Sequence, residues 1–203
     1  MEQRYVKFDV ACLQKIAAKS VGRQQCVSIK KLAEGGFNRV FLLRMDDGFE
    51  VIAKIPYPIA IPPHYLTASE VATMQFLRQH LELPVPHVYT WSSEKSNPVG
   101  TEYIIMERAN GVALGDIWWS LSGKQMLKII DQLVLYEAKM FRTPLPRYGS
   151  LYFVDSLSPK DRAHPLTDDN ASSWCIGPAA NMTFWHDGRE DPNVNHGPCN
   201  PRG

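Results

Sequence analysis

Apolar residues follow two different spacings along the first third of the chain. Over residues 9–20 they recur every three or four positions, which predicts a short amphipathic helix. The apolar runs at 26–32, 39–45 and 49–55 are short and are separated by loops that contain glycine, which predicts three strands. The loop between the last two runs reads Asp-Asp-Gly, a sequence that favours a tight hairpin.

Helical spacing returns in two later segments. Residues 67–81 predict a helix with one apolar stripe, and residues 123–142 predict a longer helix. Ser122 and Gln125 have the spacing of a capping box at the start of the longer helix. Between the two helices, residues 102–109 form an apolar run that predicts another strand.

This order of elements predicts an α+β fold. A helix, three strands, a second helix and further strands indicate an antiparallel sheet crossed by one helix. We assign this first domain to residues 1–108, and a hinge with a second, incomplete and mainly helical part to residues 109–203. In the second part, residues 149–154 and 172–176 are candidates for short strands.

Composition excludes several classes of protein. The chain has 203 residues, 44% of them hydrophobic, which is enough for one sizeable core or two small lobes. Its net charge of +1 argues against a nucleic-acid partner. No apolar run approaches the ~18 residues of a membrane span. The four cysteines lack metal-ligand spacing and indicate reduced thiols in an intracellular protein.

The stretch LAEGGFNRV, residues 32–40, is a candidate phosphate-binding loop. Against the kinase pattern G-x-G-x-x-G-x-V, Gly35 takes the middle glycine and Val40 the valine, while Ala33 and Asn38 replace the outer glycines. Gly35 and Gly36 would let the backbone approach phosphate oxygens closely. The alternative is an ordinary hairpin turn without a ligand.

Lys54 is the candidate cation beneath this loop. Alternation along the strand places Ile52 and Lys54 on one face, with Val51, Ala53 and Ile55 on the other. There Lys54 would bind the α- and β-phosphates of a nucleotide, and Ile52 would cover its adenine. The alternative is a lysine at the sheet edge that extends its ammonium group into water.

Glu70 lies on the apolar stripe of the helix at 67–81, where a carboxylate needs a cationic partner. Lys54 is the natural candidate, and we favour an ion pair between the two. Thr67 and Glu70 also have the spacing of a capping box, which would instead turn Glu70 back toward the start of the helix.

The run YIIMERA, residues 103–109, is a candidate hinge that holds the base of a nucleotide. The carbonyl of Glu107 and the N–H of Ala109 would pair with the base, and Met106 would line the back of the pocket. The alternative is a buried strand without a ligand, since Ile104 and Met106 are apolar in either case.

Taken together, the stretches KLAEGGFNRVFLLRMDDGFEVIAKIPYP, TASEVATMQFLR and NPVGTEYIIMERANGVALGDIWW resemble the aminoglycoside phosphotransferase family, which has a kinase-like fold. Within it, they resemble the fungal branch related to the altered-inheritance-of-mitochondria proteins. The resemblance implies ATP binding at Gly35, Gly36, Lys54, Glu70 and the hinge at 106–109. It also implies a mitochondrial location, but residues 1–14 make a poor transit peptide, so the cytoplasm is the alternative.

Such enzymes need a catalytic Asp and then Asn and Asp ligands for Mg²⁺, supplied in the family by an H-x-D-x-x-x-x-N segment and a later acidic motif. His186, Asp187 and Asn193 do not match that spacing. We therefore expect a truncated chain with neither catalytic nor metal-binding residues. Its expected function is ATP binding without phosphoryl transfer, for an unknown acceptor. The alternatives are a nucleotide- or partner-binding pseudokinase and a fragment without a function of its own.

The helix at 123–142 carries apolar residues on more than one face. An uncovered apolar face of this kind predicts association between copies of the chain. The residues concerned are Leu127, Ile130, Leu133, Val134, Tyr136 and Phe141.

Overall fold

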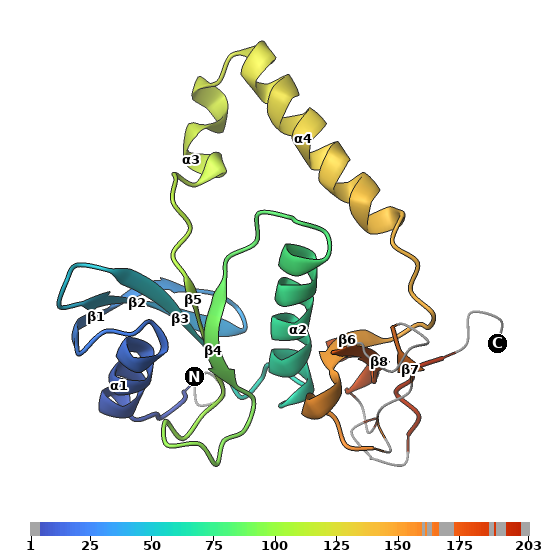
Figure 1. The fold of residues 1–203 in the computed structure, drawn as a ribbon, viewed down its shortest axis with the longest axis horizontal. Helices are drawn as coiled ribbons and strands as arrows, with labels where there is room; N and C mark the ends of the chain where they lie inside the picture. Colours follow the sequence, from blue (N-terminus) through green and yellow to red (C-terminus); the bar gives the residue numbers. More distant parts are fainter. Residues whose placement is uncertain are drawn as a thin grey trace.

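The computed structural model describes residues 5–159, 161, 164–166, 173–186, 189 and 194–199. It confirms the α+β class: an antiparallel sheet of five strands, in the order β1-β2-β3-β5-β4, is flanked by helices (Figure 1). The pairing of β1 with β2 contains two register shifts. The five strands are β1 (Cys26–Glu34), β2 (Asn38–Met45), β3 (Glu50–Pro56), β4 (Val88–Ser92) and β5 (Tyr103–Glu107).

The described helices and the second sheet complete the fold. The helices are α1 (Val10–Ser20), α2 (Tyr65–Gln79), α3 (Leu114–Ile117) and α4 (Gly123–Phe141). The second sheet has the order β6-β8-β7, with β6 (Ser150–Phe153), β7 (His164–Pro165) and β8 (Trp174–Gly177). The two strand candidates in the second part of the sequence correspond to β6 and β8. The division at residue 108 stays a prediction.

Local sequence accounts for the starts of two helices. The Asp9 carboxylate accepts the backbone N–H of Cys12 at 2.8 Å and caps α1. The predicted capping box of α4 is present: the N–H of Ser122 donates to the Gln125 amide oxygen at 2.8 Å, and the N–H of Gln125 donates to the Ser122 hydroxyl at 3.4 Å. Helix α2 starts at Tyr65, two residues before the predicted start, and its N-cap side chain forms no capping bond.

The five-stranded sheet packs on both faces. Val51, Ala53 and Ile55 of β3 are fully buried on the face that carries α1, as the alternation predicts. On the other face, Ile104 of β5 packs against Val71 of α2. The two faces of β3 therefore have different roles, and the face toward α2 is the one that carries Ile52 and Lys54.

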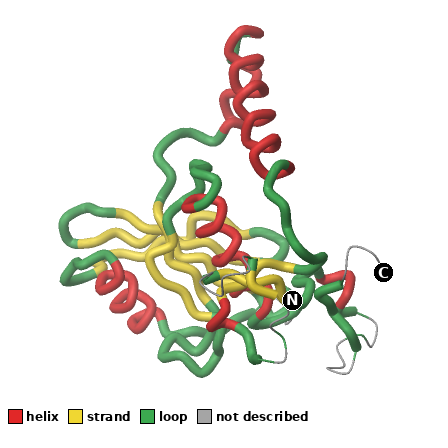
Figure 2. The backbone as a smooth tube through the Cα atoms, turned by 45° about the vertical axis from the view of Figure 1, so that its right-hand side comes forward, coloured by secondary structure: helices red, strands yellow, loops and turns green. Residues whose placement is uncertain are grey.

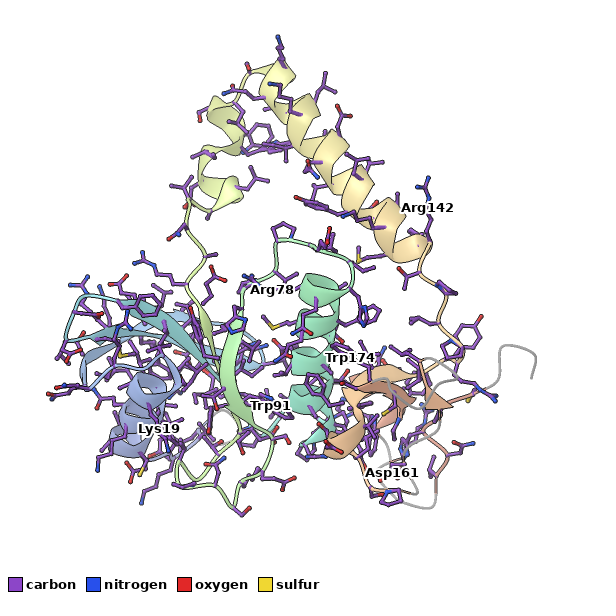
Figure 3. All side chains as sticks on the ribbon, viewed as in Figure 1. Lys19, Arg78, Trp91, Arg142, Asp161 and Trp174 are labelled. Atoms are coloured by element: carbon purple, nitrogen blue, oxygen red, sulfur yellow. The ribbon has the colours of Figure 1, made fainter. Side chains whose placement is uncertain are left out.

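Helix α2 lies between the two sheets. It contacts β4 and β5 of the larger sheet and β6 of the smaller one. Trp91 of β4 and Trp174 of β8 both lie beside it (Figure 3). The indole N–H of Trp174 donates to the carbonyl of Ala72 at 3.3 Å, so the second part of the chain packs directly on this helix.

Helices α3 and α4 form an arm that projects from the rest of the molecule (Figures 1 and 2). Not one of the 19 residues of α4 is buried, and five of its six predicted apolar side chains are exposed, while Tyr136 is half-buried. None of the described helices has the length and apolar content needed to cross a membrane. The exposed large apolar residues of α4 are Leu127, Ile130, Leu133, Val134, Leu135, Met140 and Phe141.

Candidate functional site

Lys54 and Glu70 form an ion pair between β3 and α2. The Lys54 ammonium lies 2.5 Å from Oε1 and 2.6 Å from Oε2 of Glu70. The two side chains retain 20% and 32% of their exposure, so the pair is partly shielded and still open on one side. This geometry confirms the pairing favoured by the sequence and excludes the alternative of a lysine that extends into water.

The capping-box interpretation of Thr67 and Glu70 is wrong. Thr67 lies in the first turn of α2 rather than at its N-cap, and its hydroxyl donates to Oε2 of Glu102 at 2.6 Å. Both residues of the supposed box are therefore engaged by partners from the sheet. The sequence analysis missed Glu102, which stands at position i−2 from Ile104 and so shares its face by alternation.

Glu102 is a buried carboxylate, with only 5% of its surface exposed. Burial raises the pKa of Glu102, because a carboxylate is poorly solvated there. Hydrogen bonds from the Thr67 hydroxyl and the His64 backbone N–H, with the nearby positive charge of Lys95, act in the opposite direction. The carboxylate is thus retained in the interior by specific donors.

The pairing of the strands places further predicted residues on the face of Lys54. Val40 pairs with Lys54 across β2 and β3, and Lys54 pairs with Ile104 of β5. Ile52 pairs with Met106 one row farther along. Since paired residues in a sheet point to the same side, Val40, Ile52 and Met106 form an apolar surface next to the ion pair.

Gly35 and Gly36 occupy the turn of the β1–β2 hairpin. The N–H of Gly35 donates to the carbonyl of Asn38 at 2.9 Å, and the Tyr57 N–H donates to the carbonyl of Phe37 at 2.8 Å. Gly35 does not have a left-handed φ, and a Cβ there would lie 3.7 Å from the nearest oxygens, an ordinary contact. The fold therefore does not itself require glycine at position 35.

A network of side chains holds the base of this hairpin. The Glu34 carboxylate, directly before Gly35, accepts hydrogen bonds from Lys31 at 2.7 Å and from the Tyr57 hydroxyl. Arg39 lies 3.6 Å from the same carboxylate. These donors, Lys31 foremost, lower the pKa of Glu34 to about 2.

A cavity of about 240 Å³ joins the hairpin to the ion pair. Phe37 and Asn38 of the hairpin line one side, and the ion pair lines another. Met182, in a 3₁₀ turn of the second part of the chain, also reaches this cavity. We call this cavity the hairpin pocket; its lining includes Phe37, Asn38, Lys54, Thr67, Glu70 and Met182.

Glu107 and Ala109, the hinge residues predicted to pair with a base, lie outside the lining of the hairpin pocket. The Glu107 carboxylate accepts the N–H of His87 at 2.9 Å and a guanidinium N–H of Arg78 at 3.3 Å. The Glu107 N–H donates to the carbonyl of His87 at 2.7 Å. Ala109 follows the end of β5 and is exposed. Their role in holding a base stays a prediction.

The C-terminal stretch contains the residues that resemble a catalytic segment but do not match its spacing. Asp187 and Asn193 lie outside the described residues. Among the residues that the structure does describe, no group of three or more His, Cys, Asp or Glu side chains could hold a metal ion. All four cysteines are free thiols in the structure.

The sequence is similar to that of a set of fungal proteins, although no protein-family model matches it. It is 49% identical over 174 residues to a subtelomeric hrmA-associated cluster protein of Aspergillus fumigatus, an alignment that covers 86% of this chain and 33% of the relative. It is 30% identical over 186 residues to altered inheritance of mitochondria protein 9, mitochondrial, of Yarrowia lipolytica, covering 84% and 32%.

A third relative is the protein of the same name in Debaryomyces hansenii, 27% identical over 190 residues, with 84% of this chain and 30% of the relative covered. The chain thus spans about a third of the length of the curated relatives it matches. The similarity to altered-inheritance-of-mitochondria proteins agrees with part of the expected resemblance. Membership of the aminoglycoside phosphotransferase family stays a prediction.

Proposed function

We propose that this chain binds a nucleoside triphosphate, ATP, with its phosphates in the hairpin pocket. The observation that carries the proposal is the Lys54–Glu70 ion pair, which opens into a cavity beside a glycine hairpin. An ammonium group has three N–H donors, and the two oxygens of Glu70 engage two of them. The third is available to a phosphate oxygen.

Two regions of the site would hold two parts of such a ligand, its phosphates and its base. A cavity of about 240 Å³ is smaller than the usual range for a whole ligand of this size and suits its phosphate end. The base would then lie along the apolar surface of Val40, Ile52 and Met106. In that position, the carbonyl of Glu107 and the N–H of Ala109 are the backbone groups proposed to pair with it.

We propose further that this chain by itself does not transfer phosphate. Transfer requires carboxylates that hold Mg²⁺ and orient the acceptor hydroxyl. The sequence contains no segment with the H-x-D-x-x-x-x-N spacing. Since the relatives are about three times as long, the chain would supply the nucleotide-binding part of a longer phosphotransferase-like protein. The names of the Yarrowia lipolytica and Debaryomyces hansenii relatives favour a mitochondrial location, with the cytoplasm as the alternative.

Calorimetric titration with ATP tests the proposed site. Lys54→Met is expected to weaken binding by about tenfold or more, because it removes a charged hydrogen-bond donor. Lys19→Met makes the same chemical change on α1, far from the hairpin pocket, and is expected to bind like the unmodified chain (Figure 3). Equal affinities for the two variants would overturn the assignment of Lys54.

Gly35→Ala is a second variant for the same site. Because the fold accommodates a Cβ at this position, its thermal unfolding midpoint is expected to match that of the unmodified chain. ATP affinity is expected to fall, since the methyl group would occupy the space that the phosphates need. An unchanged affinity would favour the ordinary hairpin turn.

A second function, as a partner-binding module, has support in the arm. Large apolar residues of α4 are exposed between Leu127 and Phe141, and we propose that a second copy of the chain covers them. Light scattering is expected to give a mass above that of one chain, and Leu133→Glu to lower it. Gln132→Glu adds the same charge at the adjacent position as a control. A monomeric unmodified chain would contradict the proposal.

A further inference from the structure

Helix α2 begins without a cap of its own. The first N–H groups of any helix have no partner within the helix. In α2, the N–H groups of Tyr65 and Leu66 donate to the carbonyls of Pro63 at 2.8 Å and Pro62 at 3.0 Å, so backbone groups rather than a side chain at the N-cap accept them. The N-cap residue of α2 is His64, and its side chain forms no capping bond. Its imidazole is instead engaged with the Ser156 carbonyl at 3.0 Å and the Ser93 hydroxyl at 2.8 Å.

A side-chain acceptor from outside the helix also engages this end of α2. Glu102, at the entry to β5, accepts the backbone N–H of His64 and the hydroxyl of Thr67, the latter at 2.6 Å. Glu102 is 5% exposed and Thr67 is 3% exposed, so this contact is shielded from water. A negative charge at this end of a helix is also favoured by the helix dipole. We call it the Thr67–Glu102 contact.

The Thr67–Glu102 contact lies next to the Lys54–Glu70 ion pair. On the helix, Glu70 follows Thr67 by three residues, and residues at that spacing are neighbours on one face. On the sheet, Lys54 pairs with Ile104, and alternation along the chain puts Glu102 on the same face as Ile104. Two polar contacts, in adjacent rows, therefore join one face of α2 to one face of the sheet.

The packing of α2 gives a reason for two such contacts. Its buried positions are Thr67, Ala68, Ser69, Val71 and Ala72, all of them small side chains. A smooth face of small residues fills space well, but it offers few large side chains that would resist a rotation or a shift of the helix. Buried polar contacts have their best-attested role in fixing register of this kind.

We propose that Glu102 and Thr67 are positioning residues for the candidate nucleotide site: they fix the first turns of α2 so that the Glu70 carboxylate meets the Lys54 ammonium. The consequence for ligand binding rests on the function proposed above. The consequence for the Lys54–Glu70 ion pair does not rest on that function, because this pair forms without a ligand.

A double-mutant cycle tests, without any ligand, whether the Thr67–Glu102 contact supports the Lys54–Glu70 ion pair. Lys54→Met, Glu70→Gln and the double variant are unfolded in urea, which gives the coupling between Lys54 and Glu70. The cycle is repeated in the background of Thr67→Val, which has the shape of threonine without the hydroxyl. We expect the coupling to fall to less than half of its value. Thr67→Ser, which keeps the hydroxyl, is expected to restore it.

Two further variants separate positioning from general destabilisation. Ser69→Ala removes another buried hydroxyl of α2, one that does not bond to Glu102 among the described residues, and is expected to leave the coupling unchanged. Glu102→Gln keeps one acceptor oxygen and is expected to reduce the coupling less than Thr67→Val does. An unchanged coupling in Thr67→Val, or an equal loss in Ser69→Ala, would overturn the proposal.

ATP titration of the same variants then distinguishes the two proposals. If the unmodified chain binds ATP, Thr67→Val is expected to weaken binding by up to about tenfold, with recovery in Thr67→Ser. Binding that is unaffected by Thr67→Val would refute the positioning role for the ligand site. If the unmodified chain binds no ATP, the proposed function fails, while the coupling measurement still decides the role of the Thr67–Glu102 contact.

Discussion

Helices α2 and α4 differ in how they are held. Helix α4 has a complete capping box and a pronounced apolar pattern, yet it buries none of its residues. Helix α2 has no capping side chain of its own, yet it is enclosed between two sheets and joined to one of them by two polar contacts. Signals in the local sequence therefore determine that a helix forms, while partners far away in the sequence determine whether it is buried.

The largest expected difference between the two helices concerns stability. Val71 of α2 is fully buried and Val134 of α4 is 55% exposed. Val71→Ala removes two packed methyl groups and is expected to lower the free energy of unfolding by about 1–3 kcal/mol. Val134→Ala is the matched change on α4 and is expected to stay within about 0.5 kcal/mol. Urea denaturation measures both, and equal losses would mean that α4 is packed in solution.

The capping box of α4 provides a smaller and more local test. Ser122→Ala is expected to cost about 1 kcal/mol of helix stability, because it removes the hydroxyl that accepts from the N–H of Gln125 and donates to the Gln125 side chain. Since α4 is not packed against a core, this loss should increase hydrogen exchange in α4 and leave the exchange of α2 amides unchanged. A loss of protection in both helices would show that the arm is coupled to the core.

The contacts of the two helices should also differ in their response to pH. Glu102 has a raised pKa in the folded chain, so folding retains a proton that the unfolded chain releases above its ordinary pKa of 4.5. The stability of the unmodified chain, relative to Glu102→Gln, should therefore fall as pH rises from 4.5 through the raised pKa. One proton limits the slope to about 1.4 kcal/mol per pH unit. The box of α4 uses a hydroxyl and an amide and has no such dependence.

Glu34 is the matched control for this experiment, because its pKa moves in the opposite direction. It falls to about 2, so the stability contributed by Glu34 is present above 4.5 and is lost as pH falls from 4.5 toward 2. Glu34→Gln should remove that acid-side dependence. Urea denaturation at a series of pH values below and above 4.5 gives the free energy of unfolding of both variants. If this free energy changed with pH in parallel for the unmodified chain and Glu102→Gln, the raised pKa of Glu102 would be contradicted.

The sequence predicted those features that depend on regular local spacing. The two faces of β3 follow from strict alternation, and the capping box of α4 follows from residues three positions apart. Thr67 and Glu70 have the same spacing as that box, yet there the capping alternative is wrong and the favoured Lys54–Glu70 ion pair is confirmed, because Glu70 pairs with β3 and Thr67 with Glu102. The position of Glu102 on the face toward α2 could have been predicted by extending the alternation of β5 back from Ile104. The packing of Trp174 on Ala72 could not, since the two lie 102 positions apart and no periodic pattern encodes which surfaces meet.

Among the described residues, β1 lies at one edge of the larger sheet, and its sequence bears on how the chain would aggregate. Lys30 and Lys31 are exposed on this strand, and both register shifts with β2 distort it. Lysines and bulges are the usual features that prevent another strand from adding to a sheet edge. Copies of this chain should therefore assemble without pairing strands at β1. Infrared spectra of the assemblies are expected to keep the native amide bands and to lack the cross-β band of amyloid.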